Sequence, residues 1–175
     1  MACPGYVEVL ENMVTMCTDK DFVFFILGDT PPALPPDGTS ISNWAENEYD
    51  VIIVDCSDPI GPGEGLFTHA FYQNVYKALK PDGLFVQQTE SPFYHQPLIR
   101  RLSKDIKNIF PIHEMYLAHI PIYPGGMHCF TIGSKKYASK DVNLSNRQKL
   151  ETKYYNQELQ KAAFALPNFV KELIK

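Results

Sequence analysis

The residues with the clearest chemical potential in this sequence are two aspartates on one short loop. Asp55 and Asp58 stand in the segment DCSDP, directly after the apolar residues 51–54. Two carboxylates on a proline-bounded loop can bind a diamine electrostatically, and one of them can hold or accept a proton from an attacking amine. The following residues, 58–65, are rich enough in glycine and proline to form a hinged flap. A structural interpretation is equally open, in which Asp55 caps a turn and Asp58 precedes a proline for backbone reasons.

Other polar side chains follow at places where a binding site would use them. Gln88 and Glu90 come at the end of an apolar run, where an amide oxygen can accept from an ammonium group and a carboxylate adds negative charge. Tyr123 stands in a Pro-Gly-rich turn, where its ring could line a pocket and its hydroxyl could hydrogen-bond an amine. Each also has a structural alternative: polar residues at strand ends are commonly just solvated, and a tyrosine can pack as a lid over apolar side chains.

The histidines do not form a metal-binding pattern. His113 and His119 lack HExxH spacing, and on a strand they lie too far apart for easy joint ligation. His69, His95 and His128 form no evident cluster in the sequence. GxSxG and GxGxxG motifs are also absent. We therefore expect no metal site, no hydrolase triad and no glycine-rich dinucleotide loop.

The elements that must position these residues alternate as in an α/β fold. Residues 51–54 are β-branched and apolar, as in a strand covered on both faces. Residues 67–79 have apolar side chains at helical spacing, and residues 84–88 form the next predicted strand after a stop and turn at residues 81–83. Ligands of open α/β sheets sit beyond the carboxyl ends of the strands. We therefore expect Asp55, Asp58 and Gln88 to converge on one crevice.

Later segments extend this sheet. Residues 97–109 predict an amphipathic helix, and residues 115–122 and 128–132 predict an antiparallel hairpin at the sheet edge, with its turn at 123–126. Residues 135–150 form a polar connection, and the segment from Leu166 leads into a short closing helix through Ile174. Residues 22–27 could form a strand, whereas the proline-dense stretch 29–36 resembles no regular element.

The composition of the chain limits the classes of protein to which it can belong. A chain of 175 residues with 45% hydrophobic content predicts one globular core. The net charge of -4, without a Lys/Arg-rich run, does not favour nucleic-acid binding. The four cysteines, Cys3, Cys17, Cys56 and Cys129, contain no CxxC pair, which favours reduced thiols in a cytoplasm. Neither a secretory leader nor an apolar stretch of membrane-spanning length is evident, so we expect a cytoplasmic protein that makes no membrane contact.

Three long motifs, taken in order, resemble the spermidine synthase (polyamine aminopropyltransferase) family, especially its bacterial members. They are YDVIIVDCSDPIGPGEGLFTHAFYQNVYKALKPDGLFVQQTESPF, IPIYPGGMHCFTIGSKK and KYYNQELQKAAFALPNFVKELI. The resemblance implies a Rossmann-like, methyltransferase-type sheet with flanking helices and a C-terminal antiparallel hairpin. It divides the chain into a divergent N-terminal segment, 1–36, and a partial aminopropyltransferase catalytic domain, 37–175.

The resemblance also implies a reaction and an amine site. Decarboxylated S-adenosylmethionine serves as co-substrate, without a prosthetic group, and its aminopropyl group passes to putrescine to give spermidine and methylthioadenosine. Asp55 matches the family's proton acceptor beside the attacking amine and is also one of the substrate-binding residues. Asp58, Gln88 and Tyr123 match residues that bind the diamine or the polyamine product.

On the nucleoside side, the resemblance assigns fewer residues. Asp37 and Gly38 match the pair that contacts the adenine of the co-substrate, and Pro62 matches a further nucleoside contact. The family's N-terminal β-rich domain and its GGGDGG-like loop, with the acidic residue that grips the ribose, have no counterpart in this sequence. A homodimer is expected by resemblance.

Two other hypotheses stay open beside the enzyme. One is a truncated, catalytically silent homologue that binds polyamine or pairs with a full-length subunit. The other is a methyltransferase of similar fold, which the amine-binding set weakens.

Overall fold

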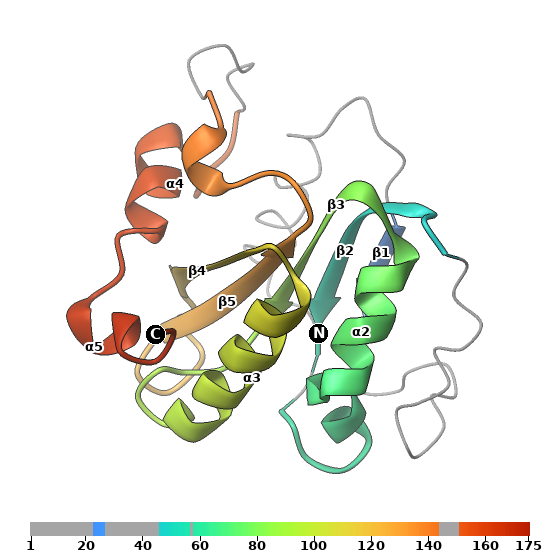
Figure 1. Cartoon of the computed structure of the whole chain (residues 1–175). Helices are drawn as coiled ribbons and strands as arrows, with labels where there is room; N and C mark the ends of the chain where they lie inside the picture. The colour runs from blue at the N-terminus through green and yellow to red at the C-terminus, as the bar shows by residue number, and fades with distance from the viewer. Residues whose placement is uncertain (1–22, 27–45, 57, 144–150) are drawn as a thin grey trace.

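The core of the protein is one mixed five-stranded sheet. The computed structural model describes residues 23–26, 46–56, 58–143 and 151–175. The spatial order is β1-β2-β3-β5-β4, with β1, β2 and β3 parallel and β5 antiparallel to both of its neighbours (Figure 1). The strands are β1 (Val23–Ile26), β2 (Tyr49–Asp55), β3 (Leu79–Gln88), β4 (Ile112–His119) and β5 (Met127–Ser134). The predicted α/β class, the predicted strand near residues 22–27 and the hairpin at the sheet edge are confirmed.

Two helices cover one face of this sheet. They are α2 (His69–Ala78) and α3 (Gln96–Ile109), which lie side by side in Figure 1. Side chains alternate along each strand, so Ile52 and Val54 of β2 pack into the helix-covered core. Ile53, between them, instead packs with Val86 and Phe130 in a separate cluster on the opposite face. Helices α2 and α3 therefore do not cover the face of the sheet that carries Ile53 and Val86, near the ends of β2 and β3.

The C-terminal segment, which follows the β4–β5 hairpin, packs against α3 and β4. Its elements are a 3-10 turn η2 (Ser139–Asp141), α4 (Gln157–Ala163) and α5 (Asn168–Lys171). Val170 packs in a cluster with Ile99 of α3, whereas the Phe164 ring lies 5.5 Å from the Tyr116 ring. The closing helix was predicted, but α4 was not. Among the described residues, no helix is both long and apolar enough to cross a membrane.

Local details differ from the sequence-based expectations in three places. The predicted turn at residues 81–83 lies inside β3, where the pairing with β2 jumps from Tyr49↔Leu79 to Val51↔Leu84. The proline and glycine signals are therefore absorbed by a bulge rather than by a chain reversal. The predicted helix 67–79 begins only at His69, because the Thr68 side chain caps it by accepting from the Phe71 N–H at 3.2 Å. The predicted strand 115–122 is shifted to Ile112–His119.

Gly133 in β5 gives a direct test of this packing. A Cβ at this position would lie 2.7 Å from the Phe110 ring atoms Cδ2 and Cγ, closer than real carbon atoms approach. Gly133→Ala should lower the free energy of unfolding by about 1–3 kcal/mol, since the ring must move in a filled core. Urea denaturation measures this. In a double-mutant cycle with Phe110→Leu, the two losses should be less than additive; full additivity would contradict the steric explanation.

Candidate active site

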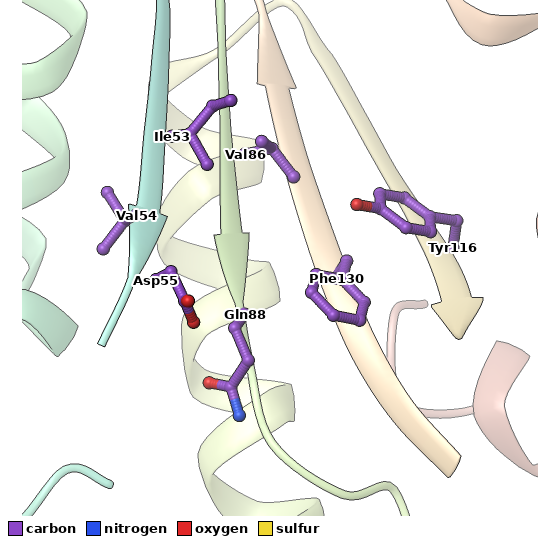
Figure 2. A pocket seen from close by; sticks show the side chains of 7 residues that line it. All are labelled: Ile53, Val54, Asp55, Val86, Gln88, Tyr116 and Phe130. Carbon is purple, nitrogen blue, oxygen red and sulfur yellow. The ribbon is translucent and has the colours of Figure 1, made fainter. Parts of the chain in front are cut away.

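A pocket lies at the carboxyl ends of β2 and β3. Figure 2 shows the Asp55 and Gln88 side chains side by side at these two strand ends, with apolar residues farther along the same face. Asp55 is the last residue of β2, and Gln88 is the last of β3. The full lining is Ile53, Val54, Asp55, Val86, Gln88, Tyr116 and Phe130. The pocket therefore combines an apolar wall with a polar end.

Strand register explains why Asp55 and Gln88 meet. β2 and β3 are parallel neighbours whose pairing runs through Val54↔Gln87, one residue before each polar side chain. Gln88 is also paired with Phe130 of β5, which fixes it between two strands. Gln88 is only 8% exposed, and its Oε1 has no hydrogen-bond partner among the described residues. A buried amide oxygen without a partner is unfavourable, so this atom is suited to accept from a ligand.

Asp58 adds a second carboxylate next to this pocket. It lies in the loop beyond β2, where its carbonyl accepts from the Ile60 N–H at 2.7 Å in a tight turn. Burial, followed by the charge of Asp58, raises the pKa of Glu90, so Asp58 lies close to that carboxyl. The residues after it form a 3-10 helix, η1 (Gly61–Phe67), within the stretch that the sequence predicts as a hinged flap.

Tyr123 reaches the same end of the sheet from the β4–β5 turn. Its ring centroid lies 4.8 Å from that of His128, the second residue of β5. The turn is closed by Gly125 and Gly126, which both have positive φ angles of 78° and 67°. Tyr123 is 47% exposed, so its ring borders the solvent side of the site.

The structure adds two histidines that the sequence pattern did not single out. His95 Nδ1 lies 3.4 Å from Glu90 Oε2. The pKa of His128 is lowered, first by burial of its ring and second by the electrostatic effect of the nearby His95. The two residues lie near each other, His95 at the start of α3 and His128 in β5. They are far apart in the chain, and no spacing rule signals their contact. Within the described ranges, no group of three His, Cys, Asp or Glu side chains is arranged to hold a metal ion.

Gln87 and Cys56 lie on the other side of the strand ends and support the site. The Gln87 Nε2 group donates to the Leu66 carbonyl at 3.2 Å and to Cys56 Sγ at 3.8 Å, which ties η1 to the sheet. Burial, together with Asp55 and other acidic neighbours, raises the pKa of the Cys56 thiol to about 12. The thiol therefore stays protonated near neutral pH and does not supply a nucleophilic thiolate.

Only one of the three residues predicted to contact the nucleoside lies in the described part of the chain. Asp37 and Gly38 lie outside the described residues. Pro62 occupies the first turn of η1, directly beyond the loop that carries Asp58. Their roles stay predictions.

Comparison with known proteins decides the family. Residues 35–146 match the family model described as the spermine/spermidine synthase domain. The chain belongs to this family. It is 54% identical over 139 residues to the polyamine aminopropyltransferase of Caldicellulosiruptor bescii, covering 79% of this chain and 50% of that protein. The polyamine aminopropyltransferase of Moorella thermoacetica is 52% identical, with 79% and 49% covered.

Solved structures of the spermine/spermidine synthase family share the fold. A spermidine synthase in complex with the transition-state analogue AdoDATO matches with 41% identity and a TM-score of 0.67, over 83% of this chain and 52% of that one. The Thermotoga maritima spermidine synthase matches with 40% identity and a TM-score of 0.64, over 78% and 47%. The methyltransferase-like fold predicted by resemblance is thus confirmed. The chain spans about half the length of the curated relatives that it matches.

Proposed function

We propose that this chain transfers an aminopropyl group from decarboxylated S-adenosylmethionine to putrescine, giving spermidine and methylthioadenosine. The observation that carries the proposal is that Asp55 and Gln88 line one pocket at the carboxyl ends of neighbouring parallel strands. Family membership and the names of the relatives support the same reaction. The AdoDATO complex of the spermidine synthase supports a nucleoside-bearing co-substrate.

The polarity of the residues that line the pocket suits a diamine. Ile53, Val86 and Phe130 offer an apolar wall for a methylene chain, and their cluster continues toward Tyr116. Asp55 and Gln88 stand at the polar end, where an amino group can be held by a carboxylate and an amide oxygen. A short alkyl chain with charged ends matches this division.

We assign the role of proton acceptor to Asp55. Putrescine is a dication at neutral pH, because alkylamines have pKa values of about 10. One nitrogen must lose its proton, and a carboxylate oriented at that nitrogen can accept it. The nitrogen lone pair then forms a bond to the methylene carbon beside the sulfonium. The carbon–sulfur bond breaks, and its electron pair returns to sulfur as methylthioadenosine leaves.

The nucleoside would bind beside the amine pocket. We assign adenine contacts to Asp37 and Gly38 and a further contact to Pro62, whose place in η1 is next to the Asp58 loop. Binding there would bring the sulfonium toward the strand ends that hold the amine.

Product formation by the full 175-residue chain tests the proposal. Purified protein should convert both substrates to methylthioadenosine and spermidine, measured by liquid chromatography with mass spectrometry, and omission of putrescine should stop both products. Calorimetry with decarboxylated S-adenosylmethionine should show binding. No product together with no nucleoside binding would overturn the enzyme. Polyamine binding without turnover would favour the silent homologue, and activity only with a full-length subunit would favour a paired complex.

A further inference from the structure

Gln87 is a buried amide on the helix-covered face of the sheet, and the proposed transfer assigns it no role. It is 1% exposed and points to the same side as Phe85, because side chains two residues apart in a strand share a face. That side carries the apolar core beneath α2 and α3. Burying an amide there costs free energy, which hydrogen bonds must offset. The partners of these bonds therefore indicate what the residue does.

The amide nitrogen of Gln87 holds both ends of the segment that carries Asp58. Its Nε2 donates to Cys56 Sγ at 3.8 Å and to the Leu66 carbonyl at 3.2 Å. Cys56 directly follows β2, and Leu66 lies near the end of η1 with its side chain in the core. One side chain of β3 thus fixes the point where the segment leaves the sheet and the point where it enters the core. We call this pair of contacts the tether.

Three successive carbonyls at the end of η1 accept hydrogen bonds from side chains. The bonds run from Thr68 Oγ1 to Gly65, from Gln87 Nε2 to Leu66 and from Arg101 Nη1 to Phe67, at 2.9, 3.2 and 2.8 Å. Carbonyls at the C-terminal end of a helix lack intrahelical partners, so such donors determine where that end is held. Thr68 is local and Arg101 belongs to α3, whereas Gln87 ties this end of η1 to the sheet.

The second polar atom of the amide indicates that global stability does not explain its place. Gln87 Oε1 is buried and has no hydrogen-bond partner among the residues that the structure describes. Its removal from water is therefore uncompensated, which offsets the gain from the bonds of Nε2. Methionine has nearly the same length and would fill the space without that cost. The amide thus contributes little to the stability of the whole domain and holds one segment in place.

We propose that Gln87 is a positioning residue, whose tether holds the segment from Cys56 to Leu66 against β3 and thereby orders the loop that carries Asp58. Gln87 does not line the pocket; its side chain lies on the face opposite to that of Gln88. The kinetic consequence of the tether rests on the proposed function. The tether itself is a property of the folded chain, so it can be measured without turnover.

Limited proteolysis of the full chain with a glutamyl endopeptidase, followed by mass spectrometry, tests the tether. Glu64 is an exposed residue of η1, and cleavage after it requires this segment to open locally. Gln87→Met should speed that cleavage about 3–10-fold, the change expected when one net hydrogen bond is lost, while the urea midpoint changes little. The KM for putrescine should rise by up to about tenfold, with a smaller change in kcat. Gln73→Met, on the exposed side of α2, is the matched control and should leave all of these values unchanged.

A second variant separates the tether from a packing defect. Cys56→Ala removes one of the two contacts, so it should speed the cleavage by a smaller factor, and Gln87→Met should add less in that background than alone. Equal cleavage of the unsubstituted chain and Gln87→Met overturns the inference, and so does faster cleavage with a matching fall in the urea midpoint.

The remaining outcomes distinguish the tether from the proposed function. Faster cleavage of Gln87→Met beside an unchanged KM for putrescine overturns the role in ordering the Asp58 loop, while the transfer reaction stands. If the cleavage rates differ as expected but the unsubstituted chain forms no methylthioadenosine, the proposed function fails and the tether stands.

Discussion

Asp55→Asn should lower kcat for aminopropyl transfer by about 10²–10⁴-fold, the range expected when a general base is lost. Asparagine has nearly the same shape as aspartate, so the end of β2 and the pocket lining should keep their geometry. The amide cannot accept the proton that the attacking nitrogen must lose. The substitution also removes one negative charge from the site where the amine binds. Initial rates of methylthioadenosine formation at saturating putrescine measure the effect.

A matched substitution distinguishes this chemistry from a general loss of charge. Asp141→Asn removes a carboxylate from the exposed turn η2, away from the pocket lining, and should leave kcat unchanged. Far-UV circular dichroism of both variants checks the fold. A kcat for Asp55→Asn equal to that of the unsubstituted protein would remove Asp55 from the role of proton acceptor. A large loss in both variants would mean that overall charge, and not the position of Asp55, controls turnover.

Phe85→Ala should lower the free energy of unfolding by about 3–5 kcal/mol, which is a large share of the 5–15 kcal/mol typical of a domain. Phe85 is fully buried in β3, and its ring centroid lies 5.7 Å from those of both Tyr72 and Phe110. Removing the ring leaves a cavity between the sheet and the two helices. The same strand ends in Gln88, so the amine pocket should lose order with the core.

The neighbouring residue of the same strand provides the control. Leu84 is only partly buried, and Leu84→Ala should cost clearly less than Phe85→Ala in urea denaturation. Equal losses from the two substitutions would contradict the view that the core beneath α2 and α3 dominates the stability. Putrescine calorimetry on Phe85→Ala should show weaker binding under conditions where the variant is still folded.

Local patterns in the sequence predicted much of the fold. The β-branched run before Asp55 predicted β2, the apolar spacing after residue 67 predicted most of α2, and the glycine pair in the turn predicted the β4–β5 hairpin. These features depend on residue type and periodicity, which short windows of sequence contain. Turn signals were less dependable. Pro81 and Gly83 predicted a chain reversal, yet pairing with β2 holds them within a bulged strand.

The sequence by itself determined that Asp55 and Gln88 end neighbouring parallel strands, because that follows from the strand–helix–strand pattern. Only the tertiary structure decided what surrounds Glu90. The insertion of β5 between β3 and β4 brings His128 beside the end of β3, and the start of α3 brings His95 to the same carboxyl. Strand order and register set these contacts between segments that are distant in the chain. Residue spacing carries no information about them, so the neighbours of Glu90 emerge only when the sheet is assembled.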